Sequence, residues 1–324
     1  MRLLIVGAGS IGRRHAANAV GRAEVLLHDR DPDRARDVAA ATGTTACDTL
    51  EAALARWPAA AIVATPHGEH AATAARLLAA GCHCLVEKPL ADRLAAAHDL
   101  VERAAAADRR LYVACNMRFH AGPATLKTNL AAIGRPLFAR AHFGNWLPGM
   151  RPGVDPRDLY CARRADGGGV VLDGIHELDY LTWLLGPVTA ARGDTARLGT
   201  VTVDAEDYAA IALDHGGVRS QIHLDYLRAR KRRGCEIVGT DGVLVWESEG
   251  KRPEHCRVRL YRRDSEGWDT LMEEPDLDPD IAYRNMLERF LAAATGGPDT
   301  DLLDGATAAA ELATALAIRD GEAA

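Results

Sequence analysis

The feature that most constrains this chain is a glycine-rich turn directly after its first apolar run. Residues 3–6 read Leu-Leu-Ile-Val, and Gly7-Ala8-Gly9-Ser10-Ile11-Gly12 follows at once. In a G-x-G-x-x-G turn the first glycine permits a tight bend, the second lets a pyrophosphate approach the backbone, and the third lets the next helix pack closely on the strand. The sequence therefore predicts a dinucleotide-binding unit with its cofactor at Gly7, Gly9, Ser10, Ile11 and Gly12.

An acidic residue follows the second apolar run, residues 25–27. A carboxylate at Asp29 can accept hydrogen bonds from the adenosine ribose and repel a 2′-phosphate, which favours NAD over NADP. Arg30 weakens this preference, because a guanidinium can stack on adenine or pair with a phosphate. Asp29 is also compatible with the start of the helix that Asp31-Pro32 predicts.

Apolar runs and helical stretches continue to alternate up to residue 114. Further strands are expected at residues 60–64, 82–86 and 111–114. Repeated strand–helix units predict an α/β fold with a doubly wound parallel sheet, which binds ligands at the carboxyl ends of its strands. Thr65, Pro66 and His70 follow one of these strands and are expected near the cofactor. His67 and His70 lack a third ligand nearby in sequence, so no metal site is expected.

The turn Glu87-Lys88-Pro89 follows the strand at residues 82–86. A proline ring disfavours the α conformation at the preceding residue, so Lys88 is expected in extended backbone with a defined direction. Two interpretations are compatible with this turn. One is a solvated charge pair after a strand, and the other is a lysine directed at a bound ligand.

The composition excludes several classes of protein. A length of 324 residues allows two domains, and a net charge of -6 argues against a nucleic-acid surface. The seven cysteines, odd in number and without a C-x-x-C pair, indicate neither a disulfide framework nor a zinc site. The chain begins without a basic and apolar leader, and no apolar run approaches the roughly 18 residues of a membrane span. A cytoplasmic protein with no membrane partner is expected.

These motifs resemble the Gfo/Idh/MocA oxidoreductases. The resemblance covers nearly the whole chain and rests on the residues above with Asn116, Arg118-Phe119, Gly167-Gly168-Gly169, Asp173, His176 and Gly239-Thr240-Asp241-Gly242. It implies a Rossmann domain at residues 1–120, then an α/β domain at residues 121–324 with a large, mostly antiparallel open sheet. That sheet often forms a homodimer or homotetramer interface in the family.

The resemblance also implies a chemistry. It predicts a tightly held NAD or NADP and hydride transfer at a carbinol or ketone carbon of a sugar, sugar acid, nucleotide-sugar or cyclitol. Carried onto this sequence, Lys88 would lie near both nicotinamide and substrate, and Glu87 and Asn116 would contact the cofactor. The sequence of residues 172–180 resembles that of a branch of the family found alongside nonulosonic and other amino-sugar pathways.

Residues 170–185 are predicted as one helix that carries Asp173 and His176 on one face. Acid–base residues on that face favour a catalytic role, and an amphipathic core helix is the alternative. The family more commonly spaces this pair four apart, and here the spacing is three. Since each helical residue turns by about 100°, the pairing of Asp173 with His176 stays open.

Residues 143–166 are rich in arginine, aromatic residues, proline and glycine, which favours an ordered active-site loop. Guanidinium groups bind carboxylates and phosphates, and aromatic faces suit sugar rings, so an anionic sugar-like substrate is expected. A surface loop that pairs with its own aspartates is equally compatible. The candidate substrate-binding residues are Lys88, Arg118, Trp146, Arg151, Tyr160, Arg163 and His176.

The remainder of the chain predicts further strands and two helices. Strands are expected at residues 208–213, 219–227, 235–238, 243–247 and 257–261, and helices at residues 281–294 and 306–319. The basic run at residues 228–233 is interpreted as a solvated loop rather than a phosphate site.

The leading hypothesis is a reversible NAD(P)-dependent dehydrogenase or reductase. His176 would take the hydroxyl proton, Lys88 would polarise the substrate oxygen, and Asp173 would orient the imidazole. Two alternatives use the same fold: a cofactor-binding sensor or regulatory protein without turnover, and an NAD-dependent glycosidase that works by transient oxidation.

Overall fold

The computed structural model describes residues 1–199 and 203–322 and divides into two compact units. Unit 1 comprises Met1–Asn116 and Asp280–Leu312, and unit 2 comprises Met117–Pro279 and Ala313–Ala324. The predicted border at residue 120 lies close to the first division. The later segment of unit 1 is a difference from the prediction, which assigned all residues after 120 to the second domain.

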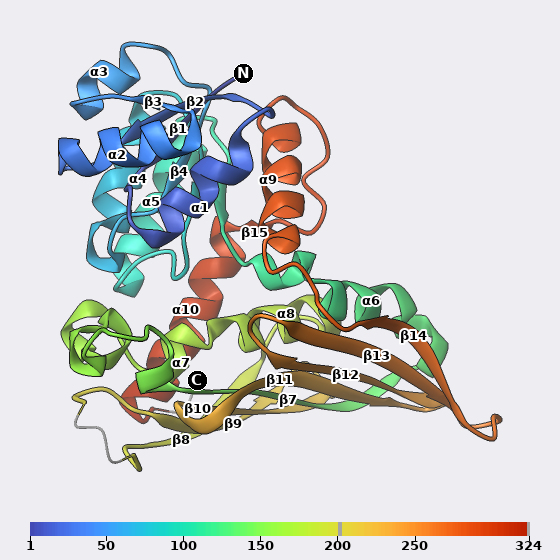
Figure 1. The fold of residues 1–324 in the computed structure, drawn as a ribbon. Coiled ribbons are helices and arrows are strands. Elements are labelled where there is room, and N and C mark those ends of the chain that lie inside the picture. Colours follow the sequence, from blue (N-terminus) through green and yellow to red (C-terminus); the bar gives the residue numbers. More distant parts are fainter. Residues whose placement is uncertain (200–202, 323–324) are drawn as a thin grey trace. The chain divides into compact units, whose positions relative to one another are not determined.

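Unit 1 contains a seven-stranded sheet in the order β15-β6-β5-β4-β1-β2-β3 (Figure 1). All its pairs are parallel except β15 with β6. The strands are β1 (Arg2–Val6), β2 (Glu24–His28), β3 (Thr45–Ala46), β4 (Ala60–Val63), β5 (His83–Val86), β6 (Leu111–Val113) and β15 (Leu303–Asp304). The helices are α1 (Ser10–Ala19), α2 (Pro32–Thr42), α3 (Leu50–Leu54), α4 (His70–Ala79), α5 (Leu94–Ala106) and α9 (Ile281–Ala293).

The apolar runs of the sequence form the centre of this sheet. Leu3, Leu4 and Ile5 are fully buried, as expected for strands that helices cover on both faces. The strand order reverses between β1 and β4, and such a switch point is where doubly wound sheets bind ligands. The predicted doubly wound fold is confirmed.

Unit 2 contains an eight-stranded sheet in the order β14-β13-β12-β11-β7-β10-β9-β8, in which β10 and β7 pair in parallel and the other described neighbours pair antiparallel. The strands are β7 (Pro136–Trp146), β8 (Ala190–Ala196), β9 (Tyr208–Asp214), β10 (Arg219–Asp225), β11 (Leu227–Gly239), β12 (Gly242–Gly250), β13 (Glu254–Arg262) and β14 (Trp268–Glu274). The helices are α6 (Ala121–Asn129), α7 (Val170–Asp173) and α8 (Ile175–Leu185), and α10 (Gly305–Asp320) contributes to both units. The predicted large antiparallel sheet is confirmed.

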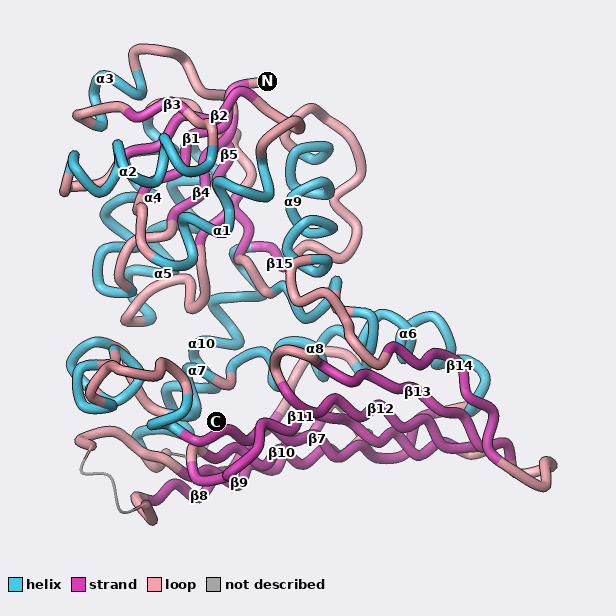
Figure 2. Tube along the Cα trace, in the orientation of Figure 1, coloured by secondary structure: helices cyan, strands magenta, loops and turns pink. Residues whose placement is uncertain are grey.

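Helices α6 and α8 lie along one face of this sheet (Figure 2). Buried residues alternate along β12 and β13, because every second side chain points at the helices. Trp246 is fully buried there, with its ring 5.8 Å from that of Tyr180 on α8. Its indole Nε1–H donates to Cys256 Sγ at 3.3 Å.

Two local predictions are wrong. Residues 228–233 form part of strand β11 rather than a solvated loop, and residues 143–146 continue strand β7 rather than open the predicted loop. Residues 228–233 carry charged side chains on both faces of the strand, and Gly144 and Asn145 interrupt residues 143–146. Neither segment therefore shows the apolar run by which buried strands are recognised. Among the described residues, no helix is long and apolar enough to cross a membrane.

The face of the sheet opposite α6 and α8 carries polar side chains from β7, β8 and β10. Arg140, His142, Gln221 and His223 line a shallow groove of about 610 Å³ on this face, together with Arg192 and Asp194. Burial and the charges of Arg228 and Arg232 lower the pKa of His142 to about 4.

The depressed pKa of His142 predicts a pH-dependent stability. Unfolded histidine has a pKa near 6.5, so between pH 6.5 and 4 the unfolded chain binds more protons than the folded one. Relative to a His142→Gln variant, the wild-type protein should lose about 1–3 kcal/mol of unfolding free energy as the pH falls through this window. Urea unfolding at several pH values measures the difference. A difference independent of pH contradicts the assignment.

The buried indole predicts a large effect on stability. Trp246→Ala should lower the free energy of unfolding by about 3–5 kcal/mol, because it opens a cavity beneath α8. Trp268→Ala on β14 is the control, since Trp268 is 44% exposed and its replacement should cost about 1 kcal/mol or less. Urea unfolding followed by circular dichroism compares them, and equal losses would contradict the packing described.

Candidate active site

The glycine turn joins β1 to α1 with no room for side chains at two positions. Gly7 has φ +104°, and a Cβ there would lie 2.4 Å from the carbonyl oxygen of Ala64. A Cβ on Gly12 would lie 1.8 Å from the carbonyl oxygen of Gly7. Helix α1 therefore packs on the turn through backbone alone, as a dinucleotide-binding turn requires.

Gly9 differs from its neighbours because a Cβ added there would meet no atom within 4 Å. It is the N-cap of α1, and no side chain caps the helix at that position. The first N–H groups of a helix attract anions. Open space above uncapped backbone N–H groups fits a pyrophosphate, so these residues can hold the predicted dinucleotide.

Asp29 is buried beside this turn. Its Oδ2 accepts a hydrogen bond from Ala8 N at 2.7 Å, and its Oδ1 accepts one from Asp31 N at 2.9 Å. The carboxylate thus joins the end of β2 to the glycine turn. This position fits the expected ribose contact, and the bond to Asp31 also fits the alternative role at the start of α2.

A pocket of about 290 Å³ lies at this edge of unit 1. Arg30 lines it and pairs with Glu69 at 3.0 Å, so its guanidinium is already bound by a carboxylate. The pocket brings together residues predicted from separate turns, namely Gly7, Gly9, Asp29, Arg30, Thr65 and Pro66.

His70 connects the turns after β4 and β5. Its side chain is fully buried, with Nδ1 2.8 Å from the carbonyl oxygen of Pro89 and Nε2 2.9 Å from that of Thr65. Burial lowers the pKa of His70, although both carbonyl groups favour the charged ring. These contacts give His70 a role in shaping the site. Among the described residues, no cluster of His, Cys, Asp and Glu could hold a metal ion.

The Glu87-Lys88-Pro89 turn follows β5. Glu87 is buried, its Oε1 lies 2.8 Å from Nε2 of His15 on α1, and its Oε2 accepts a bond from Lys88 N at 3.3 Å. The Lys88–Pro89 peptide is cis. Because β1, β4 and β5 are parallel neighbours, this turn lies at the same edge of the sheet as the glycine turn. Asn116, also buried, follows β6 at that edge.

The predicted single helix at residues 170–185 is two helices. α7 ends at Asp173, Gly174 follows, and α8 begins at Ile175. A Cβ on Gly174 would lie 2.8 Å from the carbonyl oxygen of Val170 and 2.9 Å from Leu224. Asp173 and His176 therefore lie on different helices, and the turn of about 100° per residue in one helix does not relate their side chains.

Asp173 accepts hydrogen bonds from two tyrosines. Its Oδ1 binds the hydroxyl of Tyr160 at 2.7 Å, and its Oδ2 binds the hydroxyl of Tyr226 at 3.0 Å. Tyr226 is buried and burial raises its pKa, while Tyr160 is 36% exposed. Two predicted site residues, Tyr160 and Asp173, are thus brought together. The pairing of Asp173 with His176 stays a prediction.

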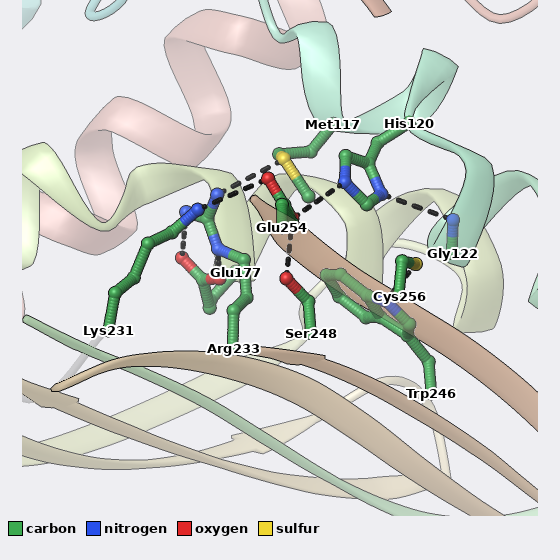
Figure 3. Close-up of polar contacts among 10 residues, drawn as sticks. All are labelled: Met117, His120, Gly122, Glu177, Lys231, Arg233, Trp246, Ser248, Glu254 and Cys256. Carbon is green, nitrogen blue, oxygen red and sulfur yellow. Dashed lines mark hydrogen bonds and ion pairs between the residues drawn. The ribbon is translucent and has the colours of Figure 1, made fainter. Parts of the chain in front are cut away.

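Helix α8 carries two buried ion pairs directly after His176. The Glu177 carboxylate accepts hydrogen bonds from Nε and Nη2 of Arg233, at 2.6 and 3.1 Å. Asp179 Oδ1 pairs with Nη2 of Arg118 at 2.7 Å. Figure 3 shows the Arg233 guanidinium directed at Glu177 and at Met117 Sδ, which lies 3.1 Å from Nη1. Buried charges are tolerated only when paired, so these contacts hold α8, and His176 with it, against the rest of unit 2.

A second polar network lies beside the first (Figure 3). His120 Nδ1 accepts from Gly122 N–H at 3.1 Å, so its Nε2 carries the proton and donates to Glu254 at 3.1 Å. Lys231 lies 3.5 Å from the other Glu254 oxygen, and burial lowers its pKa. Burial alone would raise the pKa of Glu254, but His120 and Lys231 outweigh it and lower the value to about 2.

Arg118 was singled out from the sequence, but the pairing of charged residues in these networks was not predicted. The only signal for them was period-two spacing of Lys231 and Arg233, which the surrounding charged residues obscure. The remaining candidate substrate residues are more exposed. Trp146 is 49% exposed at the end of β7, Arg151 is exposed, and Arg163 pairs with Asp166 at 2.5 Å. Their contact with a substrate stays a prediction.

Comparisons with family models match both units. A model of the GFO/IDH/MocA oxidoreductase family, with an NAD-binding Rossmann fold, matches residues 1–115, and a model of the GFO/IDH/MocA C-terminal domain matches residues 129–245.

Curated relatives include sugar and nucleotide-sugar enzymes. The chain is 32% identical over 238 residues to a UDP-N-acetylglucosamine 3-dehydrogenase of Acidithiobacillus ferrooxidans, which covers 72% of this chain and 70% of that protein. It is 29% identical over 303 residues to a 1,5-anhydro-D-fructose reductase of Ensifer adhaerens, which covers 90% of this chain and 87% of that protein.

Solved structures share the fold. The WlbA dehydrogenase from Bordetella pertussis, in complex with NADH and UDP-GlcNAcA, is similar with a TM-score of 0.77 and 25% identity over 100% of this chain and 98% of that one. An oxidoreductase from Agrobacterium radiobacter, in complex with NAD+, L-tartaric acid and magnesium, has a TM-score of 0.83 at 22% identity, over 100% and 98% of the two chains.

The two glycines of the turn predict opposite effects. Gly9→Ala should leave folding intact but weaken NAD binding about ten-fold or more, because its methyl group enters the space open to the pyrophosphate. Gly12→Ala should instead lower the unfolding temperature, since its Cβ would collide with backbone. Calorimetry with NAD+ and thermal melts separate the two effects. Gly9→Ala with normal NAD+ affinity contradicts the pyrophosphate assignment.

Proposed function

Because the chain belongs to the Gfo/Idh/MocA oxidoreductase family, we propose that it oxidises a carbinol carbon, or reduces the corresponding ketone, of a sugar-like substrate. One observation carries this proposal. The turn that bears Lys88 lies at the same edge of the parallel sheet as the glycine turn, with buried Glu87 holding it in place. A lysine is thereby held where a dinucleotide-binding sheet receives its ligand.

The cofactor is a nicotinamide dinucleotide, with NAD favoured over NADP. Asp29 presents a buried carboxylate at the end of β2, which opposes a 2′-phosphate, and Arg30 is engaged by Glu69. The other residues that would hold it are Gly7, Gly9, Ser10, Ile11, Gly12, Thr65, Pro66, His70, Glu87 and Asn116. When bound, the cofactor accepts or supplies the hydride.

Side chains of the protein carry out the proton transfer. His176 takes the proton of the substrate hydroxyl and returns it in the reverse direction. Lys88 donates a hydrogen bond to the same oxygen and polarises it. Asp173 supplies negative charge that stabilises the protonated imidazole, and the hydroxyl groups of Tyr160 and Tyr226 hold its carboxylate.

The substrate class that fits best is an anionic sugar or a nucleotide-linked sugar. Arg151 and Trp146 are exposed and offer a cation and an aromatic face, which suit a carboxylate or phosphate and a sugar ring. The similar proteins named above include enzymes of UDP-linked amino sugars, which supports this class. Arg118, Tyr160 and Arg163 are proposed to contact the same substrate.

We also propose a cytoplasmic homo-oligomer that associates through the face of the eight-stranded sheet opposite α6 and α8. This face carries the groove lined by Arg140 and His142 instead of helices. Light scattering of the purified protein tests it, and a monomer at all concentrations contradicts it.

Turnover is the direct test. Purified protein with NAD+ and a panel of uronic acids, UDP-linked sugars and inositols should produce absorbance at the reduced-nicotinamide band. A cofactor-binding sensor would give binding without this absorbance. An NAD-dependent glycosidase would cleave its substrate and leave no net reduced cofactor.

Two substitutions test the catalytic assignment. Lys88→Ala and His176→Ala should each lower kcat by about 10²–10⁴-fold, because each removes a group that handles the proton or the developing charge. The affinity for NAD+ should remain. Arg103→Ala is the control, since Arg103 is exposed on α5, where it pairs with Asp99, and the turnover of this variant should be unchanged. Normal turnover in both the Lys88→Ala and the His176→Ala variant would contradict the mechanism.

A further inference from the structure

Lys231 is a half-buried lysine whose amine has capacity for a further ligand. It lies on β11, its side chain is 19% exposed, and its Nζ is 3.5 Å from Oε2 of Glu254. Among the described residues, Glu254 is the one hydrogen-bond partner of this amine. An ammonium carries three N–H donors, so Lys231 retains donors for water or for a bound molecule.

Glu254 does not depend on Lys231 for its hydrogen bonds. Its Oε1 accepts from His120 Nε2 at 3.1 Å and from the hydroxyl of Ser248, both at shorter distances than that of the lysine. The contact of Lys231 with Glu254 is at the outer limit of a hydrogen bond. The lysine is therefore only weakly held by this carboxylate.

Two observations place Lys231 beside the helix that carries His176. Side chains alternate along β11, so Lys231 and Arg233 point to the same face of the strand, towards α8 (Figure 3). Arg233 binds the Glu177 carboxylate, and Glu177 directly follows His176 on α8. The positive charge of Arg233 also lowers the pKa of Lys231, so the two cations are within electrostatic reach of each other.

Lys251 brings a further positive charge to this place. It follows the last residue of β12, is exposed, and also lowers the pKa of Lys231. Its Nζ donates to the carbonyl oxygen of Met150 at 3.4 Å, and the next residue is Arg151, one of the proposed substrate residues. Lys251 therefore connects the end of β12 with the arginine-containing segment.

The charges of this cluster do not balance. The cluster contains three cations and two carboxylates, which are Lys231, Arg233, Lys251, Glu177 and Glu254. His120 adds no charge, because its Nδ1 accepts a hydrogen bond from a backbone N–H and burial lowers its pKa. A partly buried excess of positive charge attracts an anion. Arg233 is already bound by Glu177 through two nitrogens, which leaves the lysines to receive it.

We propose that Lys231, assisted by Lys251, binds the anionic group of the substrate, a carboxylate or a phosphate, beside His176. The proposal rests on the function proposed above. It names, for the same site, the residues that select an anionic sugar over a neutral one.

The test compares affinities for matched anionic and neutral ligands, measured by titration calorimetry on the full-length protein saturated with NADH. UDP and uridine form the pair that tests for a phosphate, and glucuronate and glucose form the pair that tests for a carboxylate. Lys231→Met and Lys251→Met each remove one charge, while Lys231→Arg keeps it. Arg262→Met is the control, since Arg262 is exposed at the opposite end of β13 from Glu254.

In at least one pair, the wild-type protein should bind the anion about ten-fold more tightly than the neutral ligand, or better. Lys231→Met should weaken binding of that anion about ten-fold, because a charge-assisted hydrogen bond is lost, and change the affinity for the neutral ligand less than about two-fold. Lys251→Met should weaken it about three-fold. Lys231→Arg should retain most of the affinity and Arg262→Met all of it. The pair that responds identifies the anionic group.

Three results would overturn the proposal: equal affinities for anion and neutral ligand in both pairs, an anion affinity that Lys231→Met leaves unchanged, or an equal loss in Arg262→Met. If thermal melts show that Lys231→Met does not fold, Lys251→Met decides by the same criteria, because it replaces an exposed side chain. Binding does not require turnover. A protein that binds an anion through Lys231 but oxidises no substrate therefore counts against the proposed function, while the assignment of Lys231 stands.

Discussion

The close approach of backbone to backbone at the glycine turn is the constraint on which the nucleotide-binding half depends. Gly7 contacts Ala64 and Gly12 contacts Gly7 at distances that no Cβ allows. This contact presses α1 onto the switch point between β1 and β4, so the helix N-terminus and the ends of the parallel strands lie at one edge. Because His15 is on the same helix, that position also brings its imidazole to Glu87.

In unit 2, buried ion pairs take the place of close backbone contacts. Helix α8 is amphipathic only in part, and two buried ion pairs, Glu177 with Arg233 and Asp179 with Arg118, hold it in place in addition to apolar contacts. Paired buried charges add little net stability but penalise any arrangement that separates them. This specificity suits a helix that carries His176. Both halves of the molecule thus orient a proposed catalytic residue through a buried carboxylate.

The repeated strand–helix units of the fold were predictable from the sequence. Strands β1, β2, β4, β5 and β6 were predictable because each is a short apolar run followed by a turn with special residues, whereas β3 (Thr45–Ala46) has no such run. Two segments were predicted wrongly. Residues 228–233 belong to strand β11, although nearly all of them are charged, and Gly174 divides residues 170–185 into two helices. The spacing of apolar residues predicts which face of a segment is buried, and neither segment has a spacing that distinguishes its true structure from the predicted one.

By itself the sequence determined the dinucleotide-binding turn, the order of strands and helices around it, and the identities of Lys88, Asp173 and His176 as candidates. These depend on residues that are neighbours in the chain. Only the tertiary structure decided what holds them: His15 and Tyr283 around Glu87, two tyrosines on Asp173, and Arg233 on Glu177. Each of these contacts joins residues more than ten positions apart, and their partners are selected by how the sheets and helices pack, which leaves no local pattern to read.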